Sequence, residues 1–352
     1  MSRDAYLNTS SGSTDARKAF EQAVYGLAAH RPSTGMALQA TLAADPDHIA
    51  VHALSGFANL ILARSELAPK RLRVGKPPAS STGDRHIMTS TKNSALNGTD
   101  LYERMGQRTT QPFAVQLLDE LEPLTDLSVI DVAAGTGGLA EAASERGASV
   151  VAVDLAPAMI ERTDERLQKY PRSSARIMNF VALDMADGIY DVAISNFGIL
   201  AYPTWQSGLD EMVRVVRPGG SIALTMWTNL DDCSPAHLLH RVFRQHFPNR
   251  DLWPPGLFPM FSPASLEEGL LEAGCVDVRA QTAEADWSPF LSVDVVDECD
   301  PMFRSFPGYA GLDDIERSNL QRSLKAAFDA YADVGGVIHL PTRAYMVVAK
   351  KA

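Results

Sequence analysis

The chain has 352 residues, 45% of them hydrophobic, and its 43 acidic and 32 basic side chains give a formal net charge of −11. A chain of this length and composition can bury a full core with room for a second small domain, which excludes a chain that is disordered throughout. The acidic balance argues against a nucleic-acid-binding protein, because contact with the phosphate backbone needs a basic surface.

Neither the apolar runs nor the cysteines indicate a membrane or metal protein. The apolar runs are too short to span a bilayer. The stretch that starts with residues 1–4 has neither the basic region nor the apolar region of a secretion signal. Cys233, Cys275 and Cys299 lie far apart with no Cys-x-x-C spacing, so we expect no bound metal and no disulfide. We therefore expect a soluble, cytoplasmic protein.

Residues 1–67 are predicted to form a small helical segment, because apolar side chains recur at helical spacing from Thr14 and Pro46 fits a first helical turn. Residues 44–57 resemble a fragment of a tetratricopeptide repeat, yet only about one and a half repeats would fit where a solenoid needs about three. We expect this segment to pack on the rest of the chain or on a second copy, as in a homodimer, or to bind a protein partner.

Residues 68–99 are rich in Pro, Ser, Thr, Gly, Asn and Lys, a composition typical of a flexible linker. A catalytic domain is therefore expected over residues 100–352. It begins with a predicted helix over 100–121, which we expect to be interrupted near Pro112 because proline lacks the backbone N–H.

The next stretch is typical of a nucleotide-binding strand–helix–strand unit. A strand is predicted over 127–132, a small-residue turn over 133–138, a helix over about 139–146 and a second strand over 149–153. Glycines at 135 and 137 permit positive φ and let a ligand touch the backbone, next to the free N–H groups of the following helix. Asp154, at the end of the second strand, is placed to accept hydrogen bonds from two ribose hydroxyls.

Two cofactor classes fit this turn. The sequence Gly-Thr-Gly-Gly-Leu-Ala from Gly135 satisfies the dinucleotide fingerprint G-x-G-x-x-A, so a nicotinamide cofactor stays open. Asp131 favours a different ligand, because a dinucleotide-binding strand carries apolar residues at that place. A carboxylate there suits a cation, such as the α-ammonium of a methionine moiety.

In this order, the motifs resemble those of the class I S-adenosylmethionine-dependent methyltransferases, and more narrowly the group typified by the quinone-biosynthesis C-methyltransferases, also called the methyltransferase type 11 group. The matching stretches are residues 129–137, 154–155 with Met159, 180–184, 191–198 and 214–220. The resemblance covers roughly residues 100–350. It implies an α/β fold, a Rossmann-like sheet of seven strands flanked by helices with the final strand inserted antiparallel.

The resemblance also implies S-adenosyl-L-methionine as the cofactor and a set of residues that hold it. Tyr102 would lie against the methionine end, Asp184 would accept the adenine amino proton, and the N–H of Met185 would meet a ring nitrogen. The full set of expected cofactor-binding residues is Tyr102, Asp131, Ala133, Gly135, Gly137, Asp154, Leu155, Met159, Asp184, Met185 and Asn196.

The sequence departs from the family at two places. The loop between Asp184 and Asp191 is shorter than the family's usual cover over the adenine. The segment from Asn196 to Gly198 lacks the N-P-P-Y sequence that holds a planar amino group, which disfavours methylation of nucleobases or glutamine.

A further segment, residues 228–262, is not required by the central fold and is predicted to be a substrate lid, with packing on the sheet edge as the alternative. Its aromatic and proline-rich composition suits a hydrophobic or aromatic acceptor. A phenol or amine acceptor would benefit from a general base. His237 and His240, on the predicted helix of this segment, are the best placed candidates for that role.

The remaining elements follow from periodicity and end signals. Helices are expected over 157–169, 204–216, 262–273, 293–306 and 313–332, strands over 176–183, 190–195, 221–227, 276–285 and 342–350, and a turn over 217–220.

The sequence thus favours an enzyme that transfers a methyl group from S-adenosylmethionine to a small, hydrophobic or aromatic metabolite, mainly by positioning the reactants for in-line displacement. Two alternatives stay open, a nicotinamide-dependent oxidoreductase and an inactive cofactor-binding scaffold that acts through the N-terminal helices. The identity of the acceptor and the atom that is methylated stay open as well.

Overall fold

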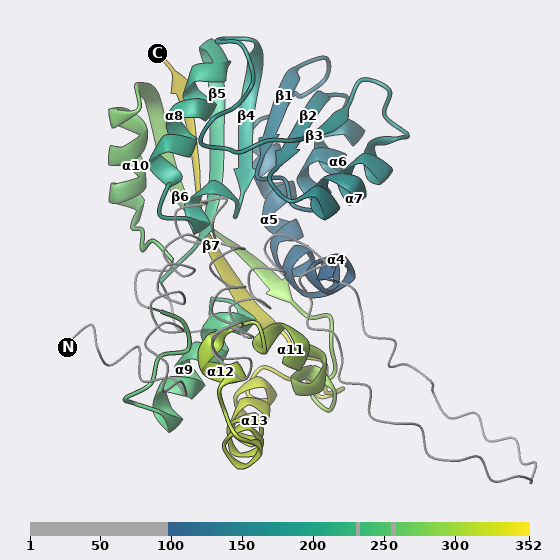
Figure 1. Cartoon of the computed structure of the whole chain (residues 1–352), viewed down its shortest axis with the longest axis vertical. Coiled ribbons are helices and arrows are strands. Elements are labelled where there is room, and N and C mark those ends of the chain that lie inside the picture. Colours follow the sequence, from purple (N-terminus) through teal and green to yellow (C-terminus); the bar gives the residue numbers. More distant parts are fainter. Residues whose placement is uncertain (1–97, 230–232, 255–257) are drawn as a thin grey trace, which may run out of the picture.

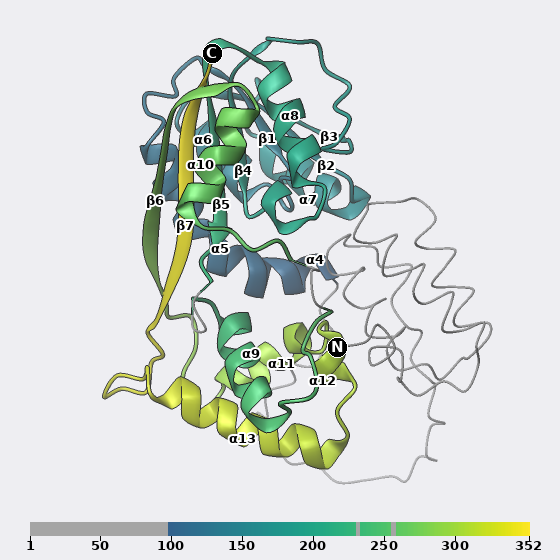
Figure 2. The ribbon, with the colours of Figure 1, turned by 90° about the vertical axis from the view of Figure 1, so that its left-hand side faces the viewer.

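The computed structural model describes residues 98–229, 233–254 and 258–352. The predicted helical segment 1–67 and all of the predicted linker except residues 98 and 99 lie outside the described residues, as do two short pieces of the predicted lid. Within the described part, a sheet layer with helices on both faces stands over a second group of helices (Figures 1 and 2).

The sheet has seven strands in the order β3-β2-β1-β4-β5-β7-β6. Their bounds are Ser128–Val132 (β1), Ser149–Asp154 (β2), Ser174–Ile177 (β3), Tyr190–Asn196 (β4), Val216–Trp227 (β5), Cys275–Trp287 (β6) and Leu340–Lys351 (β7). The strands β1 to β5 pair in parallel, and β7 runs antiparallel to both of its neighbours. The predicted fold, with its final strand inserted antiparallel, is confirmed.

Helices cover both faces of this sheet, which explains why its central strands are apolar on both sides. One face packs on α5 (Arg108–Asp119), α6 (Gly138–Glu145) and α7 (Pro157–Leu167), through a core that includes Val129. The other face packs on α8 (Trp205–Val215) and α10 (Pro263–Glu272), through a core that includes the next residue, Ile130. The carboxyl ends of the parallel strands therefore form one edge between two helical layers, where ligands of such sheets bind.

The second group of helices forms a cap with its own core, clustered below the sheet in Figures 1 and 2. It contains α9 (Pro235–His246), α11 (Val295–Phe303), α12 (Pro307–Ala310) and α13 (Asp314–Asp329). The predicted lid, residues 228–262, supplies only the first of these, so the prediction underestimated the cap. The core of the cap joins α13 to α9, through Leu320, Leu324 and Phe328 of α13 and Leu238 and Phe243 of α9. Sequence periodicity predicts that such a helix face is buried but does not reveal which helix it packs against.

Three local predictions are wrong. Pro112 lies inside an unbroken α5, because burial of Phe113 and Leu117 outweighs one missing hydrogen bond. The irregular turn comes earlier, as the π-helix η3 (Tyr102–Gln107) between α4 (Gly98–Leu101) and α5. The strand predicted over 176–183 ends at Ile177, and residues 217–220 form a bulge inside β5 instead of a turn before it.

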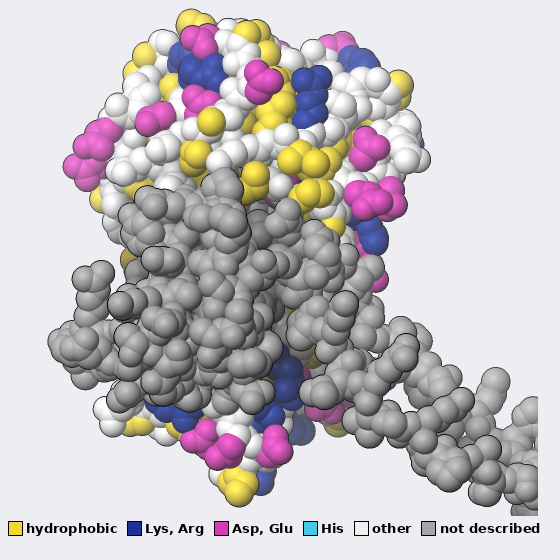
Figure 3. Space-filling view, viewed as in Figure 1, with side chains coloured by type: hydrophobic (Ala, Val, Ile, Leu, Met, Phe, Trp, Pro, Cys, Tyr) yellow, Lys and Arg dark blue, Asp and Glu magenta, His cyan; other side chains and the backbone are white. Residues whose placement is uncertain are grey.

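The surface of the sheet layer carries both signs of charge. In Figure 3, acidic and basic side chains are interspersed with hydrophobic ones over the described part of this face. Among the described helices, none is long and apolar enough to cross a membrane.

Candidate active site

The turn between β1 and α6 is held by groups from two other elements. The N–H of Gly135 donates to Asp154 Oδ2 at 2.9 Å, and the hydroxyl of Thr163 in α7 donates to the carbonyl of Gly135, also at 2.9 Å. Ala133, Gly135 and Gly137 all have positive φ, between 57° and 80°. These three residues therefore adopt left-handed backbone conformations, and the hydrogen bonds to Asp154 and Thr163 hold the turn in place.

Tyr102 of the π-helix η3 lies directly over this turn. A Cβ added to Gly135 would stand 2.9 Å from the Tyr102 hydroxyl, so the bare backbone is what allows the close approach. Burial, with the nearby charges of Asp154 and Asp131, raises the pKa of Tyr102 well above its ordinary value. The phenol is thus neutral at all physiological pH values and forms a wall over the turn.

Asp154 stands at the carboxyl end of β2 with both oxygens directed at backbone N–H groups. Oδ2 accepts from Gly135 and Oδ1 accepts from Ala156 at 2.9 Å. Each carboxylate oxygen can accept more than one hydrogen bond, so two further donors, such as vicinal hydroxyls, can be received. Burial raises the pKa of Asp154 to about 6, which leaves it mostly ionised at neutral pH.

Asp131 lies in the middle of the sheet and is 1% exposed. Its Oδ2 has no hydrogen-bond partner within the described part of the chain. Burial and the neighbouring charge of Asp154 raise the pKa of Asp131 to about 8, against the opposing N–H of Ala140. A buried carboxylate oxygen without a partner is costly, and a cation close to it would relieve that cost.

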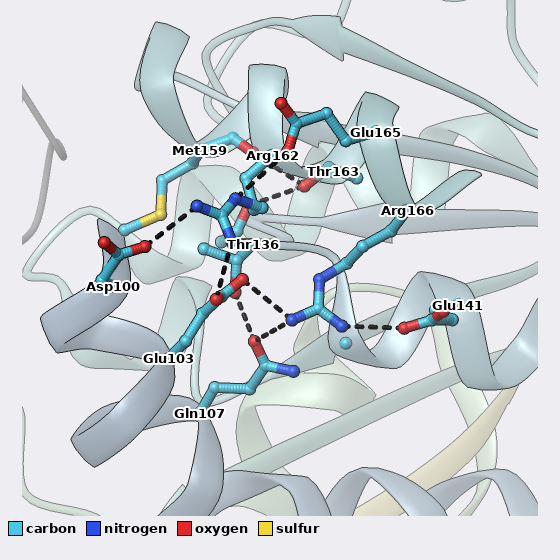
Figure 4. Close-up of polar contacts among 12 residues, drawn as sticks. Asp100, Glu103, Gln107, Thr136, Glu141, Met159, Arg162, Thr163, Glu165 and Arg166 are labelled. Atoms are coloured by element: carbon cyan, nitrogen blue, oxygen red, sulfur yellow. Dashed lines mark hydrogen bonds and ion pairs between the residues drawn. The ribbon is translucent and has the colours of Figure 1, made fainter. Parts of the chain in front are cut away.

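An ion-pair network fastens the helix that carries Tyr102 to the helices behind the turn (Figure 4). Arg162 pairs with Asp100 and Glu103, each at 3.0 Å, and Arg166 pairs with Glu103 at 2.8 Å and with Glu141 at 2.7 Å. We call these five residues the helix clamp.

The amide of Gln107 and the hydroxyl of Thr136 connect the helix clamp to the turn. Gln107 accepts a short hydrogen bond from the hydroxyl of Thr136 and a longer one, 3.3 Å, from Arg166. Because the clamp joins α4 and η3 to α6 and α7, it fixes the position of Tyr102 relative to Gly135.

A cavity of about 430 Å³ opens between the sheet edge and the cap. Its sheet side includes Tyr102, Gly135, Asp154 and Met159. Its remaining lining is mainly aromatic, with Phe197, Tyr202 and Trp227 from the sheet layer and Trp253, Phe258 and Phe306 from the cap. The volume lies in the range typical of small-molecule sites, and one space thus joins a polar end to an aromatic end.

The sequence-predicted residues fall into two groups. The cavity is lined by five of them, Tyr102, Ala133, Gly135, Asp154 and Met159, and by His237. Gly137 lies beside them, where an added Cβ would come within 2.5 Å of Thr163, and Asp131 is buried in the sheet outside the cavity lining.

The other predicted residues are not brought to the cavity. Asp184 is exposed, because β3 ends seven residues earlier and the chain between leaves the sheet edge. The N–H of Met185 bonds to Leu183, and the amide of Asn196 bonds to Thr110 and Thr225. Of the three carboxylates expected to hold the cofactor, Asp154 lines the cavity, Asp131 lies close enough to Asp154 for their charges to interact, and Asp184 does not line the cavity.

Two more predicted residues lie outside the cavity lining. Leu155 is 37% exposed at the end of β2. His240 stacks on Trp253, with ring centroids 4.6 Å apart. His240 is thus a packing partner of the cap, whereas His237 faces the cavity from the same helix.

Several residues of the site were not predicted. Gly198 is one, since an added Cβ would come within 2.5 Å of Ser195 Oγ and 2.8 Å of Ala133 Cβ. Its place three residues after the end of a predicted strand was a usable signal. Met302 and Phe306, from the segment between β6 and β7, also line the cavity and gave no such signal.

Parts of the chain are similar to known proteins. Residues 129–220 match a family model described as a methyltransferase domain. An uncharacterized protein of Mycobacterium tuberculosis is 40% identical over 101 residues, which are 28% of this chain and 37% of that protein. A demethylmenaquinone methyltransferase of Clavibacter sepedonicus is 30% identical over 142 residues, which are 40% of this chain and 57% of that enzyme.

Both matches span less than two thirds of these relatives. Among solved structures, YcgJ of Bacillus subtilis is similar with a TM-score of 0.47 and 14% identity, covering 68% of this chain and 98% of that one.

Proposed function

We propose that this chain, whose residues 129–220 match a methyltransferase-domain model, is a class I S-adenosylmethionine-dependent methyltransferase that transfers the methyl group of S-adenosylmethionine to a small, hydrophobic or aromatic metabolite. The observation that carries the proposal is the junction of Asp154 with the Gly135 turn at the edge of the cavity. This junction offers paired acceptors and bare backbone to one ligand at the polar end of a space whose other end is aromatic.

The residues present fit this cofactor. Asp154 would accept the ribose hydroxyls, and the orphaned Oδ2 of Asp131 would favour the α-ammonium, directly or through water. Tyr102 and Met159 would form the walls beside the methionine portion. When bound, S-adenosylmethionine supplies a methyl carbon on a positively charged sulfur, which leaves without protonation.

The part of the chain in this reaction is mainly to position the reactants and exclude water. Holding two reactants in line at contact distance can supply roughly 7–11 kcal/mol of the barrier. The helix clamp and the N–H of Gly135 fix the polar end, while the cap covers the aromatic end. Aromatic and thioether side chains on that end support a hydrophobic or aromatic acceptor.

The two alternatives have less support. The matched family model describes a methyltransferase domain, which supports neither a nicotinamide-dependent oxidoreductase nor a scaffold without activity. A homodimer or a protein partner held through residues 1–67 stays a prediction, since those residues lie outside the described part.

A thermal-shift comparison separates the cofactor classes. The melting temperature should rise with S-adenosylhomocysteine and stay constant with NAD at the same concentration, because Asp131 favours an ammonium. A rise with NAD alone would contradict the proposal. Label transfer from methyl-labelled S-adenosylmethionine to a small molecule of a metabolite extract would then separate an enzyme from a scaffold, for which no label would move.

A further inference from the structure

A continuous series of aromatic rings leads from the glycine turn into the cap. Phe197 follows β4 beside Gly198, where an added Cβ would stand 2.8 Å from Ala133 Cβ of the turn. The ring of Phe197 lies 4.2 Å from that of Trp227 at the end of β5. Phe197 and Trp227 both line the cavity, so the space next to the polar end begins with two large flat side chains.

The cap continues this series. Trp253 lies 5.5 Å from Phe258 and 5.3 Å from Phe306 between ring centroids, and all three line the cavity. Offset and edge-to-face contacts are the arrangements that aromatic rings prefer, and a flat aromatic ligand can enter such a wall with the same contacts.

His237 stands between the two aromatic groups. Its ring centroid is 6.3 Å from that of Trp227 and 6.3 Å from that of Trp253, and its side chain lines the cavity. Its Nδ1 is 2.7 Å from the hydroxyl oxygen of Ser234, which is 2% exposed and also caps the helix. In the tautomer whose Nδ1–H donates to Ser234 Oγ, the lone pair of the imidazole is on Nε2.

This pair has the form of an oriented base. A general base needs a pKa near neutrality and a fixed ring, and Ser234 supplies the fixing group. Resting on the proposed function, we infer that the acceptor is a flat aromatic compound with a hydroxyl group, and that His237 accepts the proton of that hydroxyl. Ser234 is then a positioning residue.

The reaction balances as follows. The phenolic oxygen forms a bond to the methyl carbon while the carbon–sulfur bond breaks and its electron pair stays on sulfur. The hydroxyl proton moves to His237 Nε2 and from there to solvent. A phenol, S-adenosylmethionine and the base thus give a methyl ether, S-adenosylhomocysteine and one proton, without any other reactant.

Binding tests the acceptor class apart from activity. Phenol, 2-naphthol and 2-hydroxyanthracene are titrated into the full chain with and without S-adenosylhomocysteine, and Trp fluorescence and calorimetry report occupancy. At least one hydroxyarene should bind, with quenching of the tryptophans that line the cavity. Ring-matched 2-naphthyl phosphate and 2-naphthoic acid should bind at least tenfold more weakly, since Asp154 contributes negative charge to the same space.

Turnover tests the role of His237. With a hydroxyarene that binds, His237→Gln should lower kcat at pH 7 by on the order of 100-fold with KM nearly unchanged. Its rate should recover toward alkaline pH, where the phenol ionises without a base. The matched control is His246→Gln, because His246 lies exposed on the same helix and bonds to Ser323 at 2.8 Å. Ser234→Ala should lower kcat less than His237→Gln and shift the pH profile.

The outcomes distinguish the inference from the function on which it rests. Failure of the wild-type chain to bind S-adenosylhomocysteine would overturn the proposed function itself. Retained S-adenosylhomocysteine binding with no bound hydroxyarene, or with methyl groups found only on amines, carboxylates or ring carbon, would overturn the acceptor class. An unchanged pH profile in His237→Gln would overturn the proton transfer.

Discussion

The N–H of Gly135 donates to Asp154 Oδ2 at 2.9 Å, so the end of β2 directly holds the turn that follows β1. Residues from two neighbouring strands thus act as one binding unit, in which a change to either partner alters the other. The helix clamp sets Tyr102 over this unit from a third side.

Replacing Gly135 with alanine should abolish cofactor binding. The substitution puts a Cβ 2.9 Å from the Tyr102 hydroxyl and also forces φ of +57° on a residue with a side chain, at a cost of roughly 1–2 kcal/mol. Calorimetry with S-adenosylhomocysteine should show at least 100-fold weaker binding. Gly274→Ala is the matched control, because φ there is +87° and an added Cβ meets nothing within 4 Å. Equal affinity losses in both variants would contradict the role of close approach at Gly135.

The stability of the ligand-free protein should fall as pH rises because of Asp131. The pKa of its carboxyl is raised to about 8 in the fold, against an ordinary value of 3.8. Between these pH values the folded state keeps a proton that the unfolded state has lost, so the free energy of unfolding decreases with rising pH. Asp154, raised to about 6, adds to the decrease at the acidic end.

Asp131→Asn should remove most of this dependence, since asparagine stays neutral. Melting temperatures of the variant and the wild type, measured from pH 5 to pH 8, should therefore diverge in favour of the variant as pH rises. A constant difference across that range would show that Asp131 does not titrate there.

Breaking the helix clamp should speed cofactor release. Glu103→Gln removes the ion pairs to Arg162 and Arg166, whose side chains are partly buried, and each such pair contributes up to about 1 kcal/mol. Stopped-flow dissociation of S-adenosylhomocysteine should be several-fold faster and should depend less on salt than in the wild type, since the pairs Arg162–Asp100 and Arg166–Glu141 remain. Glu165→Gln is the control, because Glu165 pairs with Arg162 within α7 and with no second helix among the described residues. If both variants released the ligand at the same rate, the clamp would have no part in retention.

The central unit of the site was predictable from the sequence because its signals are local. The apolar runs on either side of the small-residue turn predicted β1, α6 and β2. Asp131 was predicted as a binding residue because it is an acidic residue within the apolar strand β1. The sheet order was implied by resemblance only. The strand pairing that realises it is long-range and leaves no trace in the periodicity of a single strand.

The cap and the adenine side were not predictable in the same way. The apolar face of α13 predicts burial but does not identify α9 as the partner. Asp184 was placed by a motif whose strand continues to that residue, whereas β3 stops at Ile177 and the chain turns away. The π-helix at Tyr102–Gln107 depends on tertiary hydrogen bonds, including that between Gln107 and Thr136, which no local pattern encodes.

The most direct test of the account is the affinity of S-adenosylmethionine for Asp154→Ala, measured by calorimetry at pH 7.5 on a variant with an intact fold. Loss of the carboxylate should weaken binding by about 2–3 kcal/mol, or roughly 30- to 150-fold, the scale of hydrogen bonds to a charged acceptor. Asp164→Ala, which removes an exposed carboxylate of α7, should bind as the wild type does. An Asp154→Ala variant with wild-type affinity would contradict the claim that this strand end holds the cofactor.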